Sequence, residues 1–247
     1  MSFSDRTVLI TGATRGIGAA LTEKLLHANA NVVAVARDPA ALDSLASAHP
    51  GRVHAIPTDL SDPQAVDGLI RALETRHPTL SVVVNNAALQ VEMDFTSGDP
   101  LRHLQDLQRE LAVNLSAAMT LSVGLLPVLA RQPDAAVVNI GSALALAPKR
   151  AAPVYCATKA GLRSFTTALS YQCRANMPQV RIAHVVMALV DTDMTAGRGT
   201  GKISPETAAT GILKGLEAGR EEIWIGKAGL LRWIHRVSPG LAARILK

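Results

Sequence analysis

The chain has few aromatic residues and no long uncharged apolar run. Phe, Trp and Tyr make up 3% of its 247 residues although 48% are hydrophobic, so the core must consist mainly of Ala, Leu and Val. No apolar run reaches the roughly 20 residues that a membrane-spanning helix needs. The first strand is expected from about Thr7, which leaves no room for a signal peptide. We therefore expect a cytoplasmic protein without a membrane span.

Disulfides and metal clusters are not indicated either. Cys156 and Cys173 fall on one expected helix, many turns apart, where they are too distant to form a disulfide. Two reduced thiols are typical of cytoplasmic proteins. The seven histidines lack the spacing of metal ligands, so we assign no metal site.

The positive charge is confined to the C-terminal end. The formal net charge is +5, and the segment from Ile223 onward has five basic residues and no acid. The rest of the chain has 20 of the 25 Lys and Arg residues against 20 Asp and Glu. A neutral body without an aromatic stacking platform argues against nucleic-acid binding.

Short β-branched segments alternate with helical patterns along the chain. Strands are expected at residues 7–11, 32–36, 53–57, 80–85, 135–141, 180–187 and 222–226. Helices are expected from the first turn to about residue 28 and at about 38–48, 62–76, 104–130, 153–175 and 204–218. This alternation predicts an α/β fold. We expect a doubly wound, Rossmann-type parallel sheet of about seven strands with helices on both faces, in a single domain 1–247.

A glycine-rich turn joins the first strand to the first helix. Gly12 permits a tight turn, Gly16 lets the backbone approach a pyrophosphate, and Gly18 lets the helix pack close to the sheet. The pyrophosphate would lie at the helix N-terminus, where free N–H groups and the helix dipole attract an anion. The strand–turn–helix context favours dinucleotide binding over a turn tightened only for packing.

Tyr155 and Lys159 stand four residues apart on an expected helix, so both side chains lie on one face. A tyrosine with its ordinary pKa of about 10 is a poor proton-transfer group near neutral pH. We expect the ammonium to lower that pKa by ~1–3 units. Tyr155 could then act as a general acid or base. Taken alone, the pair also fits a solvated helix face.

Together with the glycine turn, the later motifs resemble the short-chain dehydrogenase/reductase family over essentially the whole chain. These motifs are Asn85-Asn86-Ala87, Asn114, Ser142, Tyr155 and Lys159. Segments 154–160 and 189–194 are similar to the DltE-like branch of the family.

The resemblance implies a role for each of four side chains. Tyr155 would exchange a proton with the substrate, and Ser142 would bond the substrate oxygen. Lys159 would lower the pKa of the tyrosine and hold the nicotinamide ribose. Asn114 would hold a water that links Lys159 to solvent. Read singly, Ser142 also fits a strand-end turn and Asn114 a local helix kink.

The resemblance also implies a nicotinamide cofactor. Its contacts would come from Gly12, Thr14, Arg15, Gly16, Ile17, Gly18, Arg37, Asp59, Leu60, Asn86, Ala87, Ala88, Tyr155, Lys159, Val190 and Thr192. Asp59 read singly also fits a solvated turn.

The residues after the second strand indicate which cofactor is used. NAD selection calls for an acid at the tip of this strand, whereas a 2′-phosphate calls for cations. The tip is Ala36, Arg37 follows it, and Arg15 lies in the glycine turn. Asp38 is better explained by helix capping before Pro39. We expect NADP(H) to be preferred over NAD(H).

Two positions depart from the family pattern. Ala88 replaces a glycine, and we expect its methyl group to be tolerated. Met187-Ala188 replaces Pro-Gly before Thr192, which leaves the backbone path near the nicotinamide open.

The motifs together predict an oxidoreductase that transfers hydride between NADPH and a small carbonyl or alcohol substrate. A related alternative is an alcohol dehydrogenase that works with NAD. An alternative from another class is a catalytically reduced dinucleotide-binding sensor, against which the presence of Ser142, Tyr155 and Lys159 argues. Segments 144–152 and 192–202 are expected to line the substrate pocket.

The expected helices at about 104–130 and 153–175 carry more apolar residues than one sheet face can cover. We expect them to pair with their copies in a homodimer or homotetramer. The residues of this contact would be Leu111, Leu115, Leu162, Phe165 and Leu169.

The C-terminal segment 227–247 is basic and amphipathic. Leu230, Trp233, Ile234 and Val237 fall at helical spacing, and Ser238-Pro239 would open a second short helix. One interpretation is that the apolar stripe packs on the protein, walling the substrate pocket. The other is peripheral contact with an anionic membrane surface or with an acidic, lipid-like substrate.

Overall fold

A seven-stranded parallel sheet forms the centre of the structure, a computed structural model that describes residues 1–238. The strands are β1 (Thr7–Thr11), β2 (Asn31–Ala36), β3 (Val53–Pro57), β4 (Leu80–Asn85), β5 (Ala135–Ile140), β6 (Val180–Met187) and β7 (Glu222–Ile225). Their order is β3-β2-β1-β4-β5-β6-β7. The order therefore reverses between β1 and β4, which opens a crevice at the carboxyl ends of the strands. The predicted fold class is confirmed.

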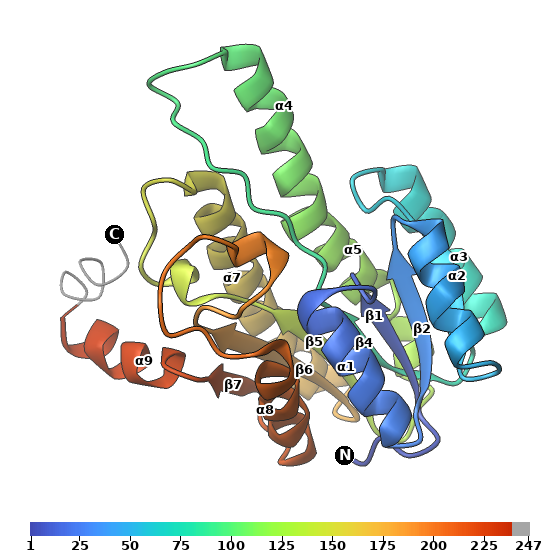
Figure 1. Cartoon of the computed structure of the whole chain (residues 1–247). Coiled ribbons are helices and arrows are strands. Elements are labelled where there is room, and N and C mark those ends of the chain that lie inside the picture. The colour runs from blue at the N-terminus through green and yellow to red at the C-terminus, as the bar shows by residue number, and fades with distance from the viewer. Residues whose placement is uncertain (239–247) are drawn as a thin grey trace.

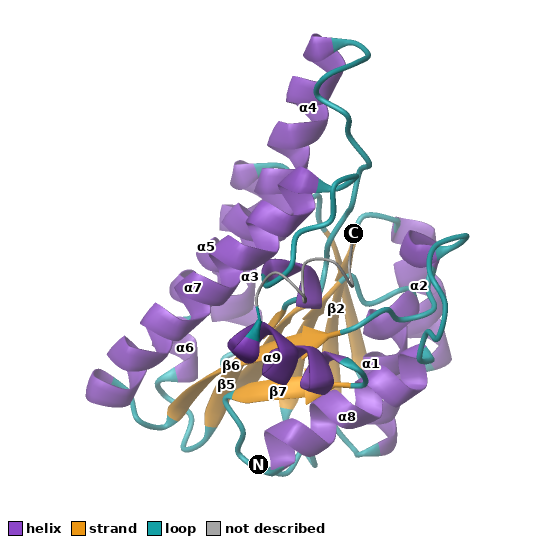
Figure 2. Ribbon diagram, turned by 90° about the vertical axis from the view of Figure 1, so that its left-hand side faces the viewer, coloured by secondary structure: helices purple, strands orange, loops and turns teal. Residues whose placement is uncertain are grey.

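Helices cover both faces of this sheet (Figures 1 and 2). One face carries α1 (Gly16–His27), α2 (Pro39–Ala48) and α8 (Pro205–Glu217). The other carries α3 (Pro63–Arg76), α5 (Ala117–Gly124), α6 (Leu126–Leu129) and α7 (Pro153–Asn176). Strands β1, β4 and β5 are buried throughout, which is why they read as continuous apolar runs.

Aspartate–proline pairs begin three of the helices. The Asp38 carboxylate accepts hydrogen bonds from the Ala40 and Ala41 amides, as its predicted capping role requires. Asp62 caps α3 in the same way. The third pair, Asp99-Pro100, begins α4 (Pro100–Leu111) four residues before the predicted start at Leu104. That earlier turn projects beyond the sheet in Figure 1.

The prediction of one continuous helix over 104–130 is wrong. A π-helical turn (Ala112–Ser116) separates α4 from α5, and α5 ends at Gly124 before the short α6. π turns insert one extra residue into a helix and are frequent at functional sites. Pro127 at the start of α6 lacks an N–H group, which explains the second break.

Two residues of the expected subunit contact lie inside the protein instead. Leu162 and Leu169 on α7 are 1% and 4% exposed, and Leu169 packs in the core on this face of the sheet. The exposed large apolar residues on α5 and α7 are Val123 and Tyr171. Helical spacing alone could not tell the two faces of α7 apart.

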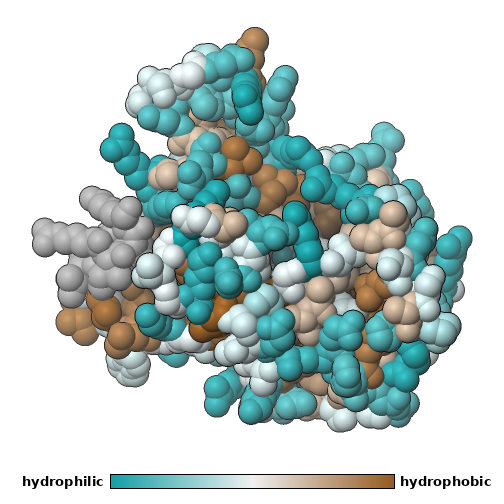
Figure 3. Space-filling model, viewed as in Figure 1, coloured by the Kyte–Doolittle hydropathy of each residue, from teal (hydrophilic) through white to brown (hydrophobic). Residues whose placement is uncertain are grey.

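The C-terminal part of the described chain is α9 (Ala228–Val237), as the spacing predicted. Leu231 is buried and Ile234 partly buried against Ala143 and Ala147. The opposite face is apolar and open to solvent, at the lower left of Figure 3 beside the grey residues. The second short helix predicted after Ser238 lies outside the described residues. No helix within residues 1–238 combines the length and apolarity required to cross a bilayer.

Candidate active site

A cavity of about 1170 Å³ opens at the carboxyl ends of the strands. Every site residue predicted from the sequence lines this cavity except Gly18 and Asn114. The structure therefore brings together residues from the whole length of the chain. Gly18 and Asn114 support the cavity from behind, through contacts described below.

The glycine turn has the geometry that the sequence predicts. Gly12 and Gly16 adopt the left-handed backbone region, with φ of +68° and +55°. A Cβ atom on Gly18 would lie 1.9 Å from the Gly12 carbonyl oxygen, so α1 can approach the turn only with glycine there. Asn86 closes the turn from β4, because its side-chain amide donates to the Thr11 carbonyl oxygen at 2.9 Å.

The first turn of α1 is open to a ligand. Arg15 is the N-cap residue and makes no side-chain hydrogen bond to the amides that follow it. Free amides at a helix N-terminus attract anions. The Thr192 side chain, which begins a 3₁₀ turn (Asp193–Thr195) after β6, lies against Gly16 and covers this turn from the other side. The arrangement fits the pyrophosphate of a dinucleotide.

Two arginines and two acids, Asp38 and Asp59, line the cavity around the tip of β2, and Arg15 also pairs with Asp193 at 3.6 Å. Arg37 is exposed and lines the cavity with Arg15 and Asp59. The Asp59 carboxylate accepts hydrogen bonds from the amide and hydroxyl of Ser61, at 2.9 and 2.7 Å. These bonds, aided by Arg37, hold the pKa of Asp59 below its ordinary value.

Lys159 is buried beneath Tyr155. Its ammonium donates a 2.8 Å hydrogen bond to the Ile140 carbonyl oxygen at the end of β5, and the residue is 2% exposed. The nitrogen lies 5.5 Å from the centre of the Tyr155 ring. The two residues share a face of α7, as their spacing predicts.

The expected lowering of the Tyr155 pKa is wrong for this structure. Burial raises the pKa of Tyr155 to about 12, and Ser142 opposes this rise only in part. The Lys159 ammonium lies 5.5 Å from the ring centre and bonds to the Ile140 carbonyl, and it does not offset the effect of burial on the phenol. Burial also lowers the pKa of Lys159 to about 8. Tyr155 therefore keeps its proton at neutral pH.

Ser142 and Asn114 complete the predicted set. The Ser142 hydroxyl accepts a hydrogen bond from the Leu144 amide at 3.1 Å and begins a 3₁₀ turn (Ala143–Ala145). The Asn114 side chain bonds both backbone groups of Leu89, at 2.8 and 2.7 Å, and reaches Thr158 at 3.4 Å. Its amide thus braces the loop after β4 against α7. The water-holding role stays a prediction.

The two departures from the family pattern fit without strain. Ala88 and Ala188 line the cavity and neither has a positive φ, so neither position needs a glycine. Met187 ends β6 with its side chain buried in the core. No residue from Met187 to Thr192 has a positive φ or follows a cis peptide bond.

Leu230, Leu231 and Ile234 of α9 wall the cavity, as one of the two interpretations of the amphipathic segment expects. Sequence reasoning missed one part of the site. Glu110, one turn before Asn114, is completely buried beside the catalytic candidates. Its spacing of four residues from Asn114 was the available signal.

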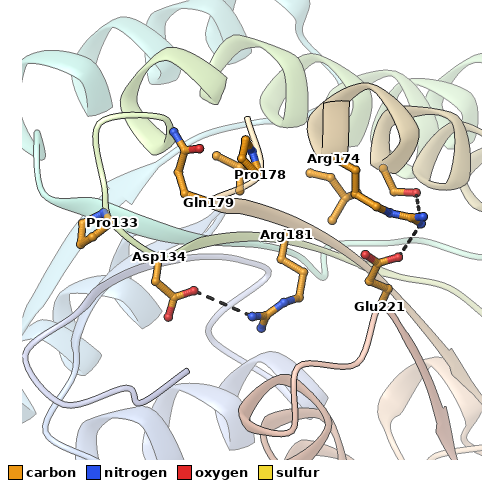
Figure 4. A pocket seen from close by; sticks show the side chains of 10 residues that line it. Pro133, Asp134, Arg174, Pro178, Gln179, Arg181 and Glu221 are labelled. Carbon is orange, nitrogen blue, oxygen red and sulfur yellow. Dashed lines mark hydrogen bonds and ion pairs between the residues drawn. The ribbon is translucent and has the colours of Figure 1, made fainter. Parts of the chain in front are cut away.

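A second, smaller pocket lies at the amino ends of β5 and β6 (Figure 4). It has a volume of about 260 Å³. Its charged side chains pair with one another or with neighbours: Arg174 with Glu221 at 2.7 Å, and Asp134 with Arg181 at 3.9 Å and with Arg6 at 2.7 Å. These pairs leave no charged side chain of its lining free for a ligand. Within residues 1–238 no group of His, Cys, Asp and Glu side chains is placed to hold a metal.

Known proteins are similar in sequence to this chain over most of its length. The family model of short chain dehydrogenases matches residues 6–202. An uncharacterized oxidoreductase, DltE of Bacillus subtilis, is 34% identical over 90% of this chain and 89% of its own. The ketoacyl reductase HetN of a Nostoc species is 27% identical over 100% of this chain and 90% of its own.

Solved structures share the fold. A short chain dehydrogenase of Burkholderia cenocepacia in complex with NADP superposes with a TM-score of 0.87, at 25% identity and 100% coverage of both chains. A short chain dehydrogenase/reductase of Burkholderia phymatum in complex with NAD has a TM-score of 0.81 at 23% identity, covering 93% of this chain and 92% of its own. The protein therefore belongs to the short-chain dehydrogenase/reductase family, in its DltE-like branch, and is an oxidoreductase.

Proposed function

We propose that this chain is an NADP(H)-dependent reductase of carbonyl compounds, able to run in reverse on the corresponding alcohols. One observation carries the proposal. Ser142, Tyr155 and Lys159 converge in the same cavity that the glycine turn of α1 lines. A single ligand-sized space thus holds both a dinucleotide cradle and a proton donor.

The preference for NADP(H) is supported by charge at the tip of β2. Arg37 and Arg15 line the cavity there, whereas Asp38 uses its carboxylate to cap α2. The Burkholderia cenocepacia relative is described with NADP and the Burkholderia phymatum relative with NAD. The two arginines favour the first of these cofactors for this chain.

In this reaction the side chains of the protein would donate the proton, orient the substrate and hold the cofactor. A bound NADPH supplies the hydride that reduces the carbonyl carbon. Tyr155 donates its phenolic proton to the carbonyl oxygen, completing the alcohol. Ser142 orients that oxygen by a hydrogen bond. Lys159 holds the cofactor's ribose and lies one helical turn from Tyr155, where it can help to return the proton.

We further propose that the substrate carbonyl is carried on an apolar chain. Ala143, Leu144, Leu231 and Ile234 form an apolar wall beside Ser142. The ketoacyl reductase HetN, by its name, acts on a carbonyl of this kind. Apolar walls with a few convergent polar groups are typical of substrate sites.

A carbonyl panel tests the proposal. NADPH oxidation is followed by absorbance with aliphatic aldehydes, ketones and oxoacyl thioesters, and again with NADH. We expect turnover of at least one apolar carbonyl and a higher kcat/KM with NADPH. Tight NADPH binding with no turnover on any carbonyl would favour the sensor alternative. Better use of NADH would favour the NAD-linked alcohol dehydrogenase.

The same proposal includes the setting of the enzyme. The chain would work as one domain spanning residues 1–247, in the cytoplasm, as a homodimer or homotetramer.

A further inference from the structure

Glu110 is a buried carboxyl group that the proposed reaction does not yet use. It lies in the last turn of α4, one turn before Asn114, and is 0% exposed. Its two carboxyl oxygens are buried and have no hydrogen bond of standard length and angle. The Val91 amide lies near enough to lower the pKa of the carboxyl but does not complete such a bond. A buried carboxyl without partners is costly, so its presence calls for an explanation.

The groups around Glu110 are those of the candidate active site. On α7 its charge acts on Tyr155, Cys156 and Lys159. On its own helix it faces Asp106. Burial, reinforced by Asp106, raises the pKa of Glu110 to about 7. Glu110 therefore gains its negative charge in the pH range where the enzyme would work.

Lys159 has little else to hold its proton. Burial lowers its pKa to about 8, and Glu110 is the one group in the described chain that raises it. The Ile140 carbonyl accepts one hydrogen bond from the ammonium but carries no net charge. His184, also buried and without a hydrogen bond, lies close enough for Lys159 to lower its pKa. Burial, reinforced by Arg163 and Lys159, lowers the pKa of His184 to about 4, so the imidazole is neutral and supplies no counter-charge to the ammonium.

We propose that Glu110 is the counter-charge that keeps the buried Lys159 protonated and Tyr155 in its neutral, proton-donating form. Glu110 is thus a positioning residue that acts through Lys159 and Tyr155 and does not touch the substrate. This inference rests on the proposed carbonyl reduction.

The test is the pH profile of Glu110→Gln, which removes the charge and keeps the shape. We expect wild type and variant to coincide near about pH 6, where Glu110 is protonated in the wild type. Above about pH 7 they should diverge, because only the wild type gains the carboxylate. The alkaline fall in kcat/KM for carbonyl reduction should begin roughly one pH unit lower in the variant. Glu110→Asp should restore part of that difference, and Glu110→Met should behave like Glu110→Gln.

Asp106→Asn is the matched control, because it removes a carboxylate one turn earlier that is more exposed and pairs with Arg102. We expect it to shift the alkaline fall much less than Glu110→Gln. NADPH affinity against pH, measured by fluorescence titration, gives a readout that needs no turnover. The variant should lose affinity at lower pH than the wild type as Lys159 loses its charge.

Two results would overturn the inference. One is a Glu110→Gln profile that is lowered equally at every pH, which a packing role predicts. The other is a profile and a binding curve that match the wild type. If the wild type reduces no carbonyl, the proposed function fails, and the binding curve alone decides the role of Glu110.

Discussion

The ammonium of Lys159 lies 5.5 Å from the centre of the Tyr155 ring, one helical turn away on α7. The same ammonium donates a 2.8 Å hydrogen bond to the Ile140 carbonyl. Burial raises the pKa of Tyr155 to about 12, so the phenol keeps its proton. This state suits the reducing direction, in which the phenol gives its proton to an alkoxide-like oxygen.

Removing the Tyr155 hydroxyl is the direct test of proton transfer. Tyr155→Phe should lower kcat by ~10²–10⁴-fold, because a general acid typically contributes that much. NADPH affinity should remain close to wild type. The control is Tyr171→Phe, at the only other tyrosine in the sequence, which is 61% exposed on the same helix. Steady-state rates near those of wild type in Tyr155→Phe would remove the tyrosine from the mechanism.

Cofactor choice depends on Arg37. Arg37→Asp should lower NADPH affinity by roughly 10–100-fold, the range expected for losing a hydrogen bond to a charged group. NADH affinity should change little or improve. Arg71→Asp, an exposed charge reversal on α3 outside the cavity, is the control. Equal NADPH and NADH affinities in the wild type, measured by titration, would contradict the expected preference.

Substitution by alanine should change the free energy of unfolding in opposite directions at two helical glycines, Gly18 on α1 and Gly68 on α3. Gly18→Ala would place its methyl 1.9 Å from the Gly12 carbonyl oxygen, so something must shift. We expect a loss of about 1–3 kcal/mol or more in the free energy of unfolding. Gly68→Ala on α3 meets no atom within 4 Å and should stabilise the protein by about 0.5–1 kcal/mol. Urea denaturation of both variants measures the contrast, and equal stabilities would refute the close approach at Gly18.

Association is expected through the helical segment 104–130, which includes α5, and through α7. Light scattering at micromolar concentration should give the mass of a dimer or tetramer. Val123→Asp, at an apolar residue 51% exposed on α5, should reduce that mass. Val237→Asp, at an exposed residue on α9, should not. A monomeric wild type would exclude the paired helices.

The second interpretation of the basic segment 227–247, contact with an anionic membrane, can be tested at the outward face of α9. Trp233 and Val237 are 64% and 84% exposed on it. Contact with an anionic membrane would be weak and salt-sensitive, because each cation near such a surface contributes about 1 kcal/mol. Co-sedimentation with anionic vesicles should then fade with salt and with Trp233→Ser, but not with Tyr171→Ser. No binding at low salt would leave α9 with only its role as a pocket wall.

The sequence by itself determined the succession of strands and helices along the chain. It also determined the glycine turn and the placement of Tyr155 and Lys159 on one helix face. These features depend on local rules: β-branched runs form buried parallel strands, and residues four apart share a helix face. The capping role of Asp38 could also be predicted, because a carboxylate before Pro39 can accept hydrogen bonds from the amides that follow the proline, here those of Ala40 and Ala41. Local geometry is enough for each of them.

Only the tertiary structure decided the features that depend on burial from several elements at once. The sequence predicted a lowered pKa for Tyr155, but desolvation by the surrounding elements outweighs its neighbours and raises it. The side chain of Asn114, in the π turn, bonds Leu89 and reaches Thr158 of α7, and no local pattern encodes these partners. Glu110 reads as an ordinary polar residue of an amphipathic helix. Its burial, and its effect on Lys159, exist only because α4 packs across α7.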